Sequence, residues 1–249
     1  MTGRVMIIGL GPGPAKWITP EASTMLAEAT DIIGYGPYVD RVPASPARRH
    51  ASDNRVEVDR ARHALELATA GARVAVVSGG DPGVFAMAAA VFEAVEAGDP
   101  AWRDLDIVVA PGVTAVLAAA ARLGAPLGHD FCVVSLSDNL KPWSVIEKRL
   151  VAAVEGDFVL AFYNPASKAR PDQIGKAFDV LRRQAGERFV VLAKAVGRPD
   201  EEIILTSLSA VKPEEVDMRT LVLIGSSQTR LIERGNAEPW IYSPRRWET

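Results

Sequence analysis

Short apolar runs alternate with amphipathic segments along the first half of the chain. The apolar runs occupy residues 5–9, 31–36, 73–81 and 105–112, and each leads into glycine. Between them lie segments with apolar residues at helical spacing, at 20–29, 59–71, 84–97 and 113–123. Strands that alternate with helices in this way predict an α/β fold with a largely parallel sheet and helices on both faces.

Local signals support the helices. Thr19 is a predicted N-cap, followed by Pro20 at the first helical position and Glu21 in the first turn. In the helix at 59–71 the apolar face is formed by Ala61, Ala64, Leu65 and Ala68, and Gly71 is a typical C-terminal stop.

The pattern changes after about residue 124. Strands are predicted at 131–136, 156–165, 189–196, 202–208 and 220–227, and helices at 145–154 and 173–184. The last two strands are separated by a short connection, so we predict that they pair antiparallel and that this sheet is mixed. Residues 238–249 are predicted to be a surface tail. We place the domain boundary within 114–127, and divide the chain into an N-terminal α/β domain, 1–118, and a C-terminal α/β domain, 119–249.

Composition narrows the function classes. The chain has 249 residues, 48% of them apolar and 24% charged, and a net charge of −3. It has no long basic run, so we expect no nucleic-acid partner. Cys132 is the single cysteine, and we expect no disulfide and no metal site. With neither an apolar span nor a secretion signal in the sequence, we expect a cytoplasmic protein without membrane contact.

The loop GLGPGP, residues 9–14, resembles a nucleotide loop but departs from the known phosphate cradles. A dinucleotide fingerprint needs glycine where Pro14 stands, and no P-loop pattern occurs. Pro12 and Pro14 also lack the backbone N–H groups that bind phosphate. The loop therefore favours a nucleoside ligand without phosphate, and the alternative is a rigid turn that binds nothing.

Two further glycine-bearing loops follow strands, SGGDPG at 78–83 and PGVTA at 111–115. Ligands of open α/β sheets bind outside the carboxyl ends of strands, so we predict that the three loops converge at one edge. Asp81 and Thr114 are the polar candidates there, and helix capping is the alternative for each.

These residues together resemble a known family. GLGPGP followed by ITPEA, then VAVVSGGDPGVF and APGVTA, are similar to the motifs of the class III S-adenosylmethionine-dependent methyltransferases, which act mainly on tetrapyrroles. The segments IIGYGPYVDRV, RHASDNRVEVDRARHALELA, AFYNPASKARPDQIGKAFDVLR and VGRPDE resemble the ring-contracting branch of that family, which methylates precorrin-3B.

The resemblance implies two α/β domains with S-adenosylmethionine bound between them, S-adenosylhomocysteine as product, and a homodimer. It implies methylation at carbon 17 of precorrin-3B with ring contraction to precorrin-4, in cobalamin biosynthesis. By motif position, the cofactor-binding residues would be Pro12, Gly79, Gly80, Asp81, Val84, Thr114, Ala115, Tyr163, Asn164, Ala195, Gly225 and Ser226.

Ring contraction needs proton transfer, and the catalytic candidates are His50, His129 and Asp81, the last through orienting the cofactor. His63 is predicted to be solvated surface. Ser137, Asp138 and Lys141, in a loop after a strand of the second domain, are weaker candidates.

The substrate's acetate and propionate groups suit basic side chains in loops, for which ordinary surface charge is the alternative. The candidates are Arg41, Arg48, Arg49, Arg55, Lys141, Lys168 and Arg170, of which we predict that Arg48, Arg49, Arg55, Lys141 and Lys168 bind substrate.

Other functions remain open at this point. Within the family, the substrate could be another precorrin, a cobalt-precorrin, uroporphyrinogen or a protein. A nicotinamide-dependent oxidoreductase is opposed by Pro14 and by the absence of an acidic residue ending the second strand. A further alternative is a non-catalytic tetrapyrrole carrier or a subunit of a biosynthetic complex. Failure to bind S-adenosylmethionine would favour that alternative.

Overall fold

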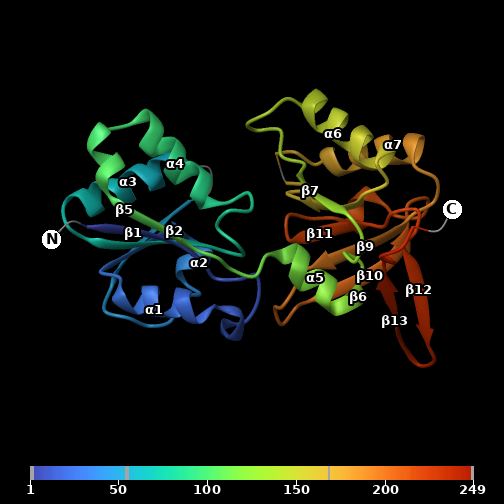
Figure 1. Ribbon diagram of the computed structural model, residues 1–249, viewed down its shortest axis with the longest axis horizontal. Helices are drawn as coiled ribbons and strands as arrows, with labels where there is room; N and C mark the ends of the chain where they lie inside the picture. The colour runs from blue at the N-terminus through green and yellow to red at the C-terminus, as the bar shows by residue number, and fades with distance from the viewer. Residues whose placement is uncertain (1–2, 54–55, 168, 248–249) are drawn as a thin grey trace. The chain divides into compact units, whose positions relative to one another are not determined.

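The chain folds as two compact units, Met1–Thr114 and Ala115–Thr249 (Figure 1). The computed structural model describes residues 3–53, 56–167 and 169–247. The predicted division at 118/119 falls inside helix α5 (Ala115–Leu123), which the structure places whole in the second unit. No helix in these residues has the length and apolar character needed to cross a membrane.

The first unit is a parallel sheet between two layers of helices. Its five strands run in the order β3-β2-β4-β1-β5, and every neighbouring pair is parallel. In chain order the elements are β1 (Arg4–Gly9), η1 (Ala15–Trp17), α1 (Pro20–Glu28), β2 (Asp31–Tyr35), α2 (Gly36–Val39), β3 (Arg48–Ser52), α3 (Glu57–Thr69), β4 (Arg73–Ser78), α4 (Met87–Ala97), η2 (Pro100–Asp104) and β5 (Asp106–Ala110).

Strand β1 shows why the apolar runs are continuous. Side chains of a strand alternate between the two faces of its sheet. Val5 and Ile7 join the core beneath α3 and α4, whereas Met6 and Ile8 join the core beneath α1. All four are fully buried, because helices cover both faces of this parallel sheet.

The predicted helix signals are largely confirmed. The Thr19 side chain accepts a hydrogen bond from the Ala22 N–H, which caps α1. The predicted apolar face of α3 is buried. Helix α4 begins at Met87 rather than at residue 84, because Phe85 takes a left-handed conformation with φ 53° and breaks the helical path. The sequence patterns missed α2 and β3, and β3 lies in a segment predicted to be a loop.

The second unit has a mixed sheet in the order β10-β9-β11-β8-β7. Strands β10 and β11 lie on either side of β9 and pair with it antiparallel, so the prediction that they pair with each other is wrong. After α5, the elements are β6 (Gly124–Ala125), β7 (Phe131–Ser135), α6 (Trp143–Glu155), β8 (Val159–Tyr163), α7 (Gln173–Gln184), β9 (Phe189–Lys194), β10 (Glu202–Ser207), η3 (Pro213–Glu215), β11 (Thr220–Ile224), β12 (Arg230–Arg234) and β13 (Ala237–Tyr242).

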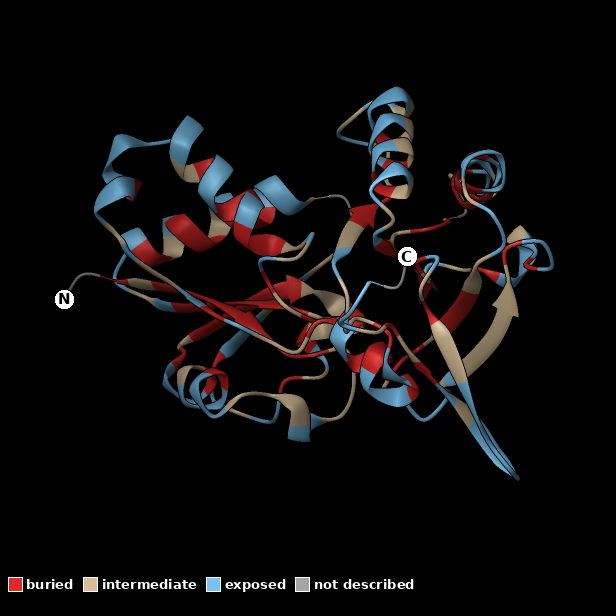
Figure 2. Ribbon diagram, turned by 45° about the vertical axis from the view of Figure 1, so that its right-hand side comes forward, coloured by how far each residue is buried: buried red, intermediate tan, exposed pale blue. Residues whose placement is uncertain are grey.

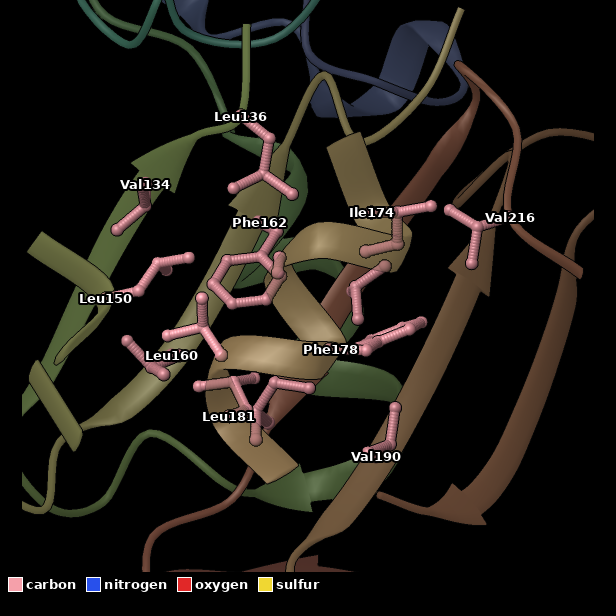
Figure 3. Packing of buried hydrophobic residues seen from close by; sticks show 14 of the residues in the cluster. Val134, Leu136, Leu150, Leu160, Phe162, Ile174, Phe178, Leu181, Val190 and Val216 are labelled. Carbon is pink, nitrogen blue, oxygen red and sulfur yellow. The ribbon is translucent and has the colours of Figure 1, made fainter. Parts of the chain in front are cut away.

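The core of the second unit lies between this sheet and the helices α6 and α7. Phe162 and Phe178 are its largest fully buried side chains, and Leu150, Ile174 and Leu181 pack around them (Figure 3). The start of α7 lies beside the loop after β7, where Gln173 Nε2 donates to Asp138 Oδ2 at 3.0 Å.

Residues 238–249 were predicted to be a surface tail, but residues 238–243 are part of the fold. Strand β13 pairs with β12 as a hairpin and with β6 in parallel, which forms a separate three-stranded sheet. Ile241 and Ser243 are each only 2% exposed, while the far end of the hairpin is exposed (Figure 2).

Candidate functional site

The three glycine loops of the first unit converge at one edge of the sheet, as predicted. Strands β4, β1 and β5 are neighbours and run parallel, so their carboxyl ends lie side by side. The backbone N–H of Gly11 donates to the Gly80 carbonyl at 3.2 Å, which joins the first loop to the second.

Glycine is required here largely because the loops touch one another. A Cβ on Gly9 would lie 2.7 Å from both the Gly112 Cα and the Gly80 carbonyl oxygen. A Cβ on Gly112 would lie 2.4 Å from the same oxygen. Gly79 is covered by the Tyr38 ring, at 2.5 Å from a built Cβ. The sequence could not distinguish contact between loops from approach to a ligand.

Gly80 is the exception, because its Cβ direction is open. The nearest atom to a Cβ built there is the Val113 carbonyl oxygen at 4.0 Å, and the backbone has φ +109°. Gly80 as a whole is buried, so glycine is needed here for its positive φ, which side chains with a Cβ rarely adopt.

Asp81 ties the second loop to the third. Its Oδ1 accepts from the Gly83 N–H at 2.8 Å, and its Oδ2 accepts from the Gly112 N–H at 3.0 Å. It does not cap α4, which starts six residues later at Met87. Both carboxylate oxygens accept hydrogen bonds from backbone N–H groups, so Asp81 holds the second and third loops together, and its predicted role in orienting the cofactor stays a prediction.

The Arg41 side chain binds the backbone carbonyls of the first glycine loop. Its Nη2 donates to the carbonyl oxygens of Gly11 at 2.7 Å and Gly13 at 2.8 Å, and lies 3.3 Å from that of Leu10. The sequence suggested Arg41 only as a candidate for substrate carboxylates. Its role as a clamp on the proline-containing loop depends on α2, which the sequence did not reveal.

Three of the other predicted residues lie in or beside these loops. Pro12 is in the first loop and is partly exposed, and Val84 is in the second loop, with its N–H 3.4 Å from the Asp81 carbonyl. Thr114 ends the third loop and is 9% exposed.

The corresponding edge of the second unit carries Tyr163, Asn164 and Ala195. Strands β7, β8 and β9 run in the same direction, so the residues that end them share this edge. Tyr163 Oη accepts the Val116 N–H at 2.9 Å, at the start of the helix α5 whose first residue is the predicted Ala115. Asn164 Nδ2 donates to Ser135 Oγ at 3.0 Å.

The backbone is strained at two of these positions. Asn164 has φ 51° and Ala195 has φ 49°. Left-handed conformations are uncommon for residues with a Cβ, and they cluster at sites where the fold must place a loop for function. Both lie directly after a strand, so the strain sets the direction in which each chain leaves the sheet.

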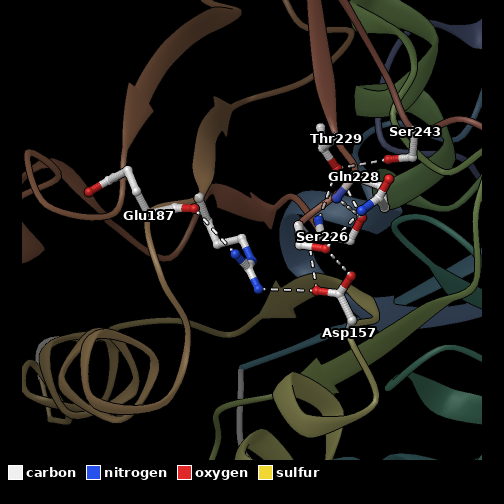
Figure 4. Close-up of polar contacts among 8 residues, drawn as sticks. Asp157, Glu187, Ser226, Gln228, Thr229 and Ser243 are labelled. Carbon is white, nitrogen blue, oxygen red and sulfur yellow. Dashed lines mark hydrogen bonds and ion pairs between the residues drawn. The ribbon is translucent and has the colours of Figure 1, made fainter. Parts of the chain in front are cut away.

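Gly225 and Ser226 lie at the opposite edge. Strand β11 is antiparallel to β8 and β9, and the Gly225 N–H donates to the carbonyl of Phe189, the first residue of β9. Ser226 is buried, and its N–H donates to Thr229 Oγ1 in the polar network of Figure 4. The structure therefore separates them from Tyr163 and Asn164, and we leave them out of the proposed site.

His50 is committed to a structural network. Its Nε2 lies 2.9 Å from Asp31 Oδ1, and its Nδ1 lies 3.1 Å from His63 Nε2. A carboxylate only accepts hydrogen bonds, so His50 Nε2 donates to Asp31, and in the neutral imidazole Nδ1 then accepts from His63. Asp31 is the first residue of β2, at the edge opposite to the glycine loops. A catalytic role for His50 is thus not supported, and His63 is not simply solvated.

Asp31 is the fully buried acid of this network. Burial raises the pKa of its carboxyl, but hydrogen bonds from His50, Arg48 and Thr30 outweigh burial, and the pKa is lowered below its usual value. Arg48 approaches both oxygens, with Nε at 2.9 Å from Oδ1 and Nη2 at 3.2 Å from Oδ2.

Arg48 and Arg49, which were predicted to bind substrate, make their polar contacts within the first unit instead. Arg48 pairs with Asp31, and Arg49 donates to the carbonyls of Val39, Val42 and Pro43 at 2.6 to 2.9 Å. Both belong to β3 rather than to an open loop, so the prediction that they bind substrate is not supported. The predictions for Arg55 and Lys168 fall outside the described residues.

His129 also lies away from the site edge. It precedes β7, at the end where that strand begins, and its ring packs against Trp247 with centroids 5.8 Å apart. The remaining predicted residue, Lys141, does lie in the loop after β7 and donates to the Ser137 carbonyl at 3.1 Å.

Comparison with known proteins agrees with this geometry. A family model described as tetrapyrrole (corrin/porphyrin) methylases matches residues 4–212, and the chain belongs to that family. It is 53% identical to a precorrin-3B C(17)-methyltransferase of Sinorhizobium sp. over 98% of this chain and 97% of that protein.

Two further similarities place the chain within the family. It is 43% identical to a probable cobalt-factor III C(17)-methyltransferase of Salmonella typhimurium, over 90% of this chain and 92% of that protein. The crystal structure of the methyltransferase CobJ superposes with a TM-score of 0.92 at 52% identity, and covers 97% of this chain and 100% of that one.

Proposed function

We propose that the protein transfers a methyl group from S-adenosylmethionine to carbon 17 of precorrin-3B, with ring contraction to precorrin-4, as a step of cobalamin biosynthesis. The observation that carries the proposal is the full-length similarity to a precorrin-3B C(17)-methyltransferase in a chain whose three glycine loops meet at one sheet edge. That edge presents backbone without a phosphate cradle, which suits a sulfonium nucleoside.

The residues of the first unit fit this cofactor. The hydrogen bond from Gly112 to Asp81 and those from Arg41 to the first loop hold the three glycine loops in place at this edge. When bound, the cofactor supplies an already activated methyl group. The work of the protein is then to align the accepting carbon with that methyl group and to exclude water.

The individual contacts with S-adenosylmethionine stay predictions. They involve Pro12, Gly79, Gly80, Val84 and Thr114 of the first unit, and Ala115, Tyr163, Asn164 and Ala195 of the second.

We propose that proton transfer during ring contraction uses neither predicted histidine, because His50 is hydrogen-bonded to Asp31 and His63, and His129 precedes the start of β7. We therefore expect the variant H129A to turn over normally. Turnover in H129A that falls by more than tenfold, with the melting temperature unchanged, would return that histidine to the mechanism.

The direct experiment is calorimetric titration with S-adenosylhomocysteine, with NADH as the control. We expect binding of the first at about one per chain and none of the second. Precorrin-3B and S-adenosylmethionine should then give a product heavier by one methyl group. Binding of NADH alone, or methylation of uroporphyrinogen but not precorrin-3B, would overturn the proposal.

A cobalt-containing substrate is the second candidate, favoured by the similarity to the Salmonella protein. Parallel assays with the cobalt-free and the cobalt-containing tetrapyrrole decide between them, and the higher identity to the Sinorhizobium enzyme favours the cobalt-free form. We further propose that the protein works in the cytoplasm as a homodimer, which light scattering of the purified chain would test.

A further inference from the structure

Arg170, in the loop after β8, has a guanidinium group that the fold does not satisfy. Its side chain is 13% exposed, and its nearest charged partner is Asp138, with Nη1 3.8 Å from Oδ1. Both Nε and Nη1 are buried and have no hydrogen-bond partner. Buried donors left unpaired in this way cost about 1–3 kcal/mol each, and more when they carry charge.

Gln173 explains why Asp138 does not satisfy this arginine. Gln173 is the first residue of α7 and is 5% exposed. Its Nε2 donates to Asp138 Oδ2 at 3.0 Å, while its Oε1 is buried without a partner. The amide thus restrains the carboxylate, and Arg170 keeps only a long ion pair to Asp138, with no hydrogen bond at Nε or Nη1.

The surroundings of Arg170 are electropositive. Burial lowers the pKa of the Lys141 amine, and the nearby charges of Arg149 and Arg170 lower it further, against the opposing effect of Asp138. Two carboxylates lie at the start of α7, Asp172 at the N-cap position and Asp138 on Gln173, so the helix end adds no unopposed positive charge to this group.

These features lie on the edge already described. The loop after β7 carries Asp138 and Lys141, and the loop after β8 carries Arg170. The two loops are joined where the Leu136 N–H donates to the Tyr163 carbonyl at 2.9 Å. An anion bound here would therefore lie on the edge of the sheet that carries Tyr163 and Asn164.

We propose that Arg170, supported by Lys141, binds one carboxylate side chain of the tetrapyrrole substrate. The inference rests on the proposed function, whose substrate carries acetate and propionate groups. Asp138 opposes this binding by its charge, and Gln173 acts as a positioning residue that keeps Asp138 from closing on Arg170.

The test compares the variants R170Q and D138N, which should act in opposite directions. The affinity for precorrin-3B is measured in the presence of S-adenosylhomocysteine, and kcat and KM are measured separately with S-adenosylmethionine. R170Q should weaken substrate affinity about 10- to 100-fold, the usual effect of losing a charged hydrogen bond, with affinity for S-adenosylhomocysteine unchanged. D138N should tighten it.

Two further variants complete the design. R170K keeps the charge but has fewer donors, so it should recover part of the affinity. R183Q on α7 is the matched control, because Arg183 is an exposed arginine of the same unit whose partner, Glu147, lies 3.5 Å away. We expect R183Q to bind substrate normally, and R170Q to melt close to wild type, because the loss of a long ion pair to Asp138 is offset by the removal of two buried donors without hydrogen bonds.

The outcomes separate the two proposals. If wild type methylates precorrin-3B but R170Q leaves its affinity unchanged, the carboxylate site is wrong and the proposed function stands. If R170Q and D138N lower the melting temperature alike and do not shift affinity in opposite directions, Arg170 and Asp138 form a structural ion pair. A wild-type chain that binds S-adenosylhomocysteine but does not bind or methylate precorrin-3B overturns both proposals.

Discussion

Replacing Asp81 by alanine should separate the second glycine loop from the third. The carboxylate accepts one N–H within its own loop, from Gly83, and one from Gly112 in the neighbouring loop. Removing it leaves the partly buried Gly112 N–H without an acceptor. The Gly80 carbonyl remains wedged against Gly9 and Gly112, so the loops lose their tie but keep their packing.

The expected size follows from a matched comparison with Asp99. Asp99 Oδ1 also accepts an N–H two residues on, from Ala101 at 2.9 Å, but ties no second loop. D99A should cost about 1 kcal/mol, as loss of a helix cap does. D81A should cost about 3 kcal/mol, because a hydrogen bond to a charged group contributes roughly 1.5–3 kcal/mol and the Gly83 bond is solvent-exposed.

Thermal melts and titration with S-adenosylhomocysteine measure both effects. At about 2–4 °C per kcal/mol for a chain of this size, D81A should melt well below D99A. Its affinity for S-adenosylhomocysteine should fall about 10- to 100-fold, as expected when a binding loop shifts by about 1 Å, while D99A binds normally. Equal melting temperatures in the two variants, together with normal affinity in D81A, would refute both the tie and the placement of the site.

Three further predictions follow from single contacts. G112A places a Cβ 2.4 Å from the Gly80 carbonyl, so its melting temperature and its affinity for S-adenosylhomocysteine should both fall, and a normal titration would contradict this. Because the pKa of Asp31 is lowered on folding, its contribution is present above the ordinary carboxyl pKa of about 3.9 and is lost as the pH falls through the folded value. Urea unfolding should therefore show D31N weaker than wild type at pH 7, with the difference shrinking below about pH 4, and a constant difference would contradict it. A193G should cost about 1–2 kcal/mol, whereas A195G should be nearly neutral because glycine relieves the left-handed conformation, and equal losses in urea unfolding would contradict the strain.

Local patterns predicted most of the elements because their causes are local. The continuous apolar run of β1 follows from burial on both faces, and the Thr19 cap and the buried stripe of α3 follow from spacing alone. The failures occurred where distant contacts decide. The short edge strand β3 has an exposed and charged sequence, and it is a strand because β2 offers it a parallel partner.

The residues of the candidate site show the same difference between local and distant causes. The glycine positions of the first unit were recognisable because few other residues fit a strand-to-helix turn with such close backbone contact. The histidines and arginines were assigned by chemical type, and their roles depended on direction within the sheet. His50 and Arg48 are used by the buried Asp31, which the sequence shows only as an acidic residue before an apolar run.

The sequence by itself determined that the chain is an α/β protein with glycine loops after parallel strands, and its motifs determined the family. Only the tertiary structure decided which of those residues share an edge. Strand β11 runs antiparallel, so Gly225 and Ser226 end up across the sheet from Asn164. Strand direction and order arise from contacts between segments far apart in the chain, and spacing along the sequence carries no record of them.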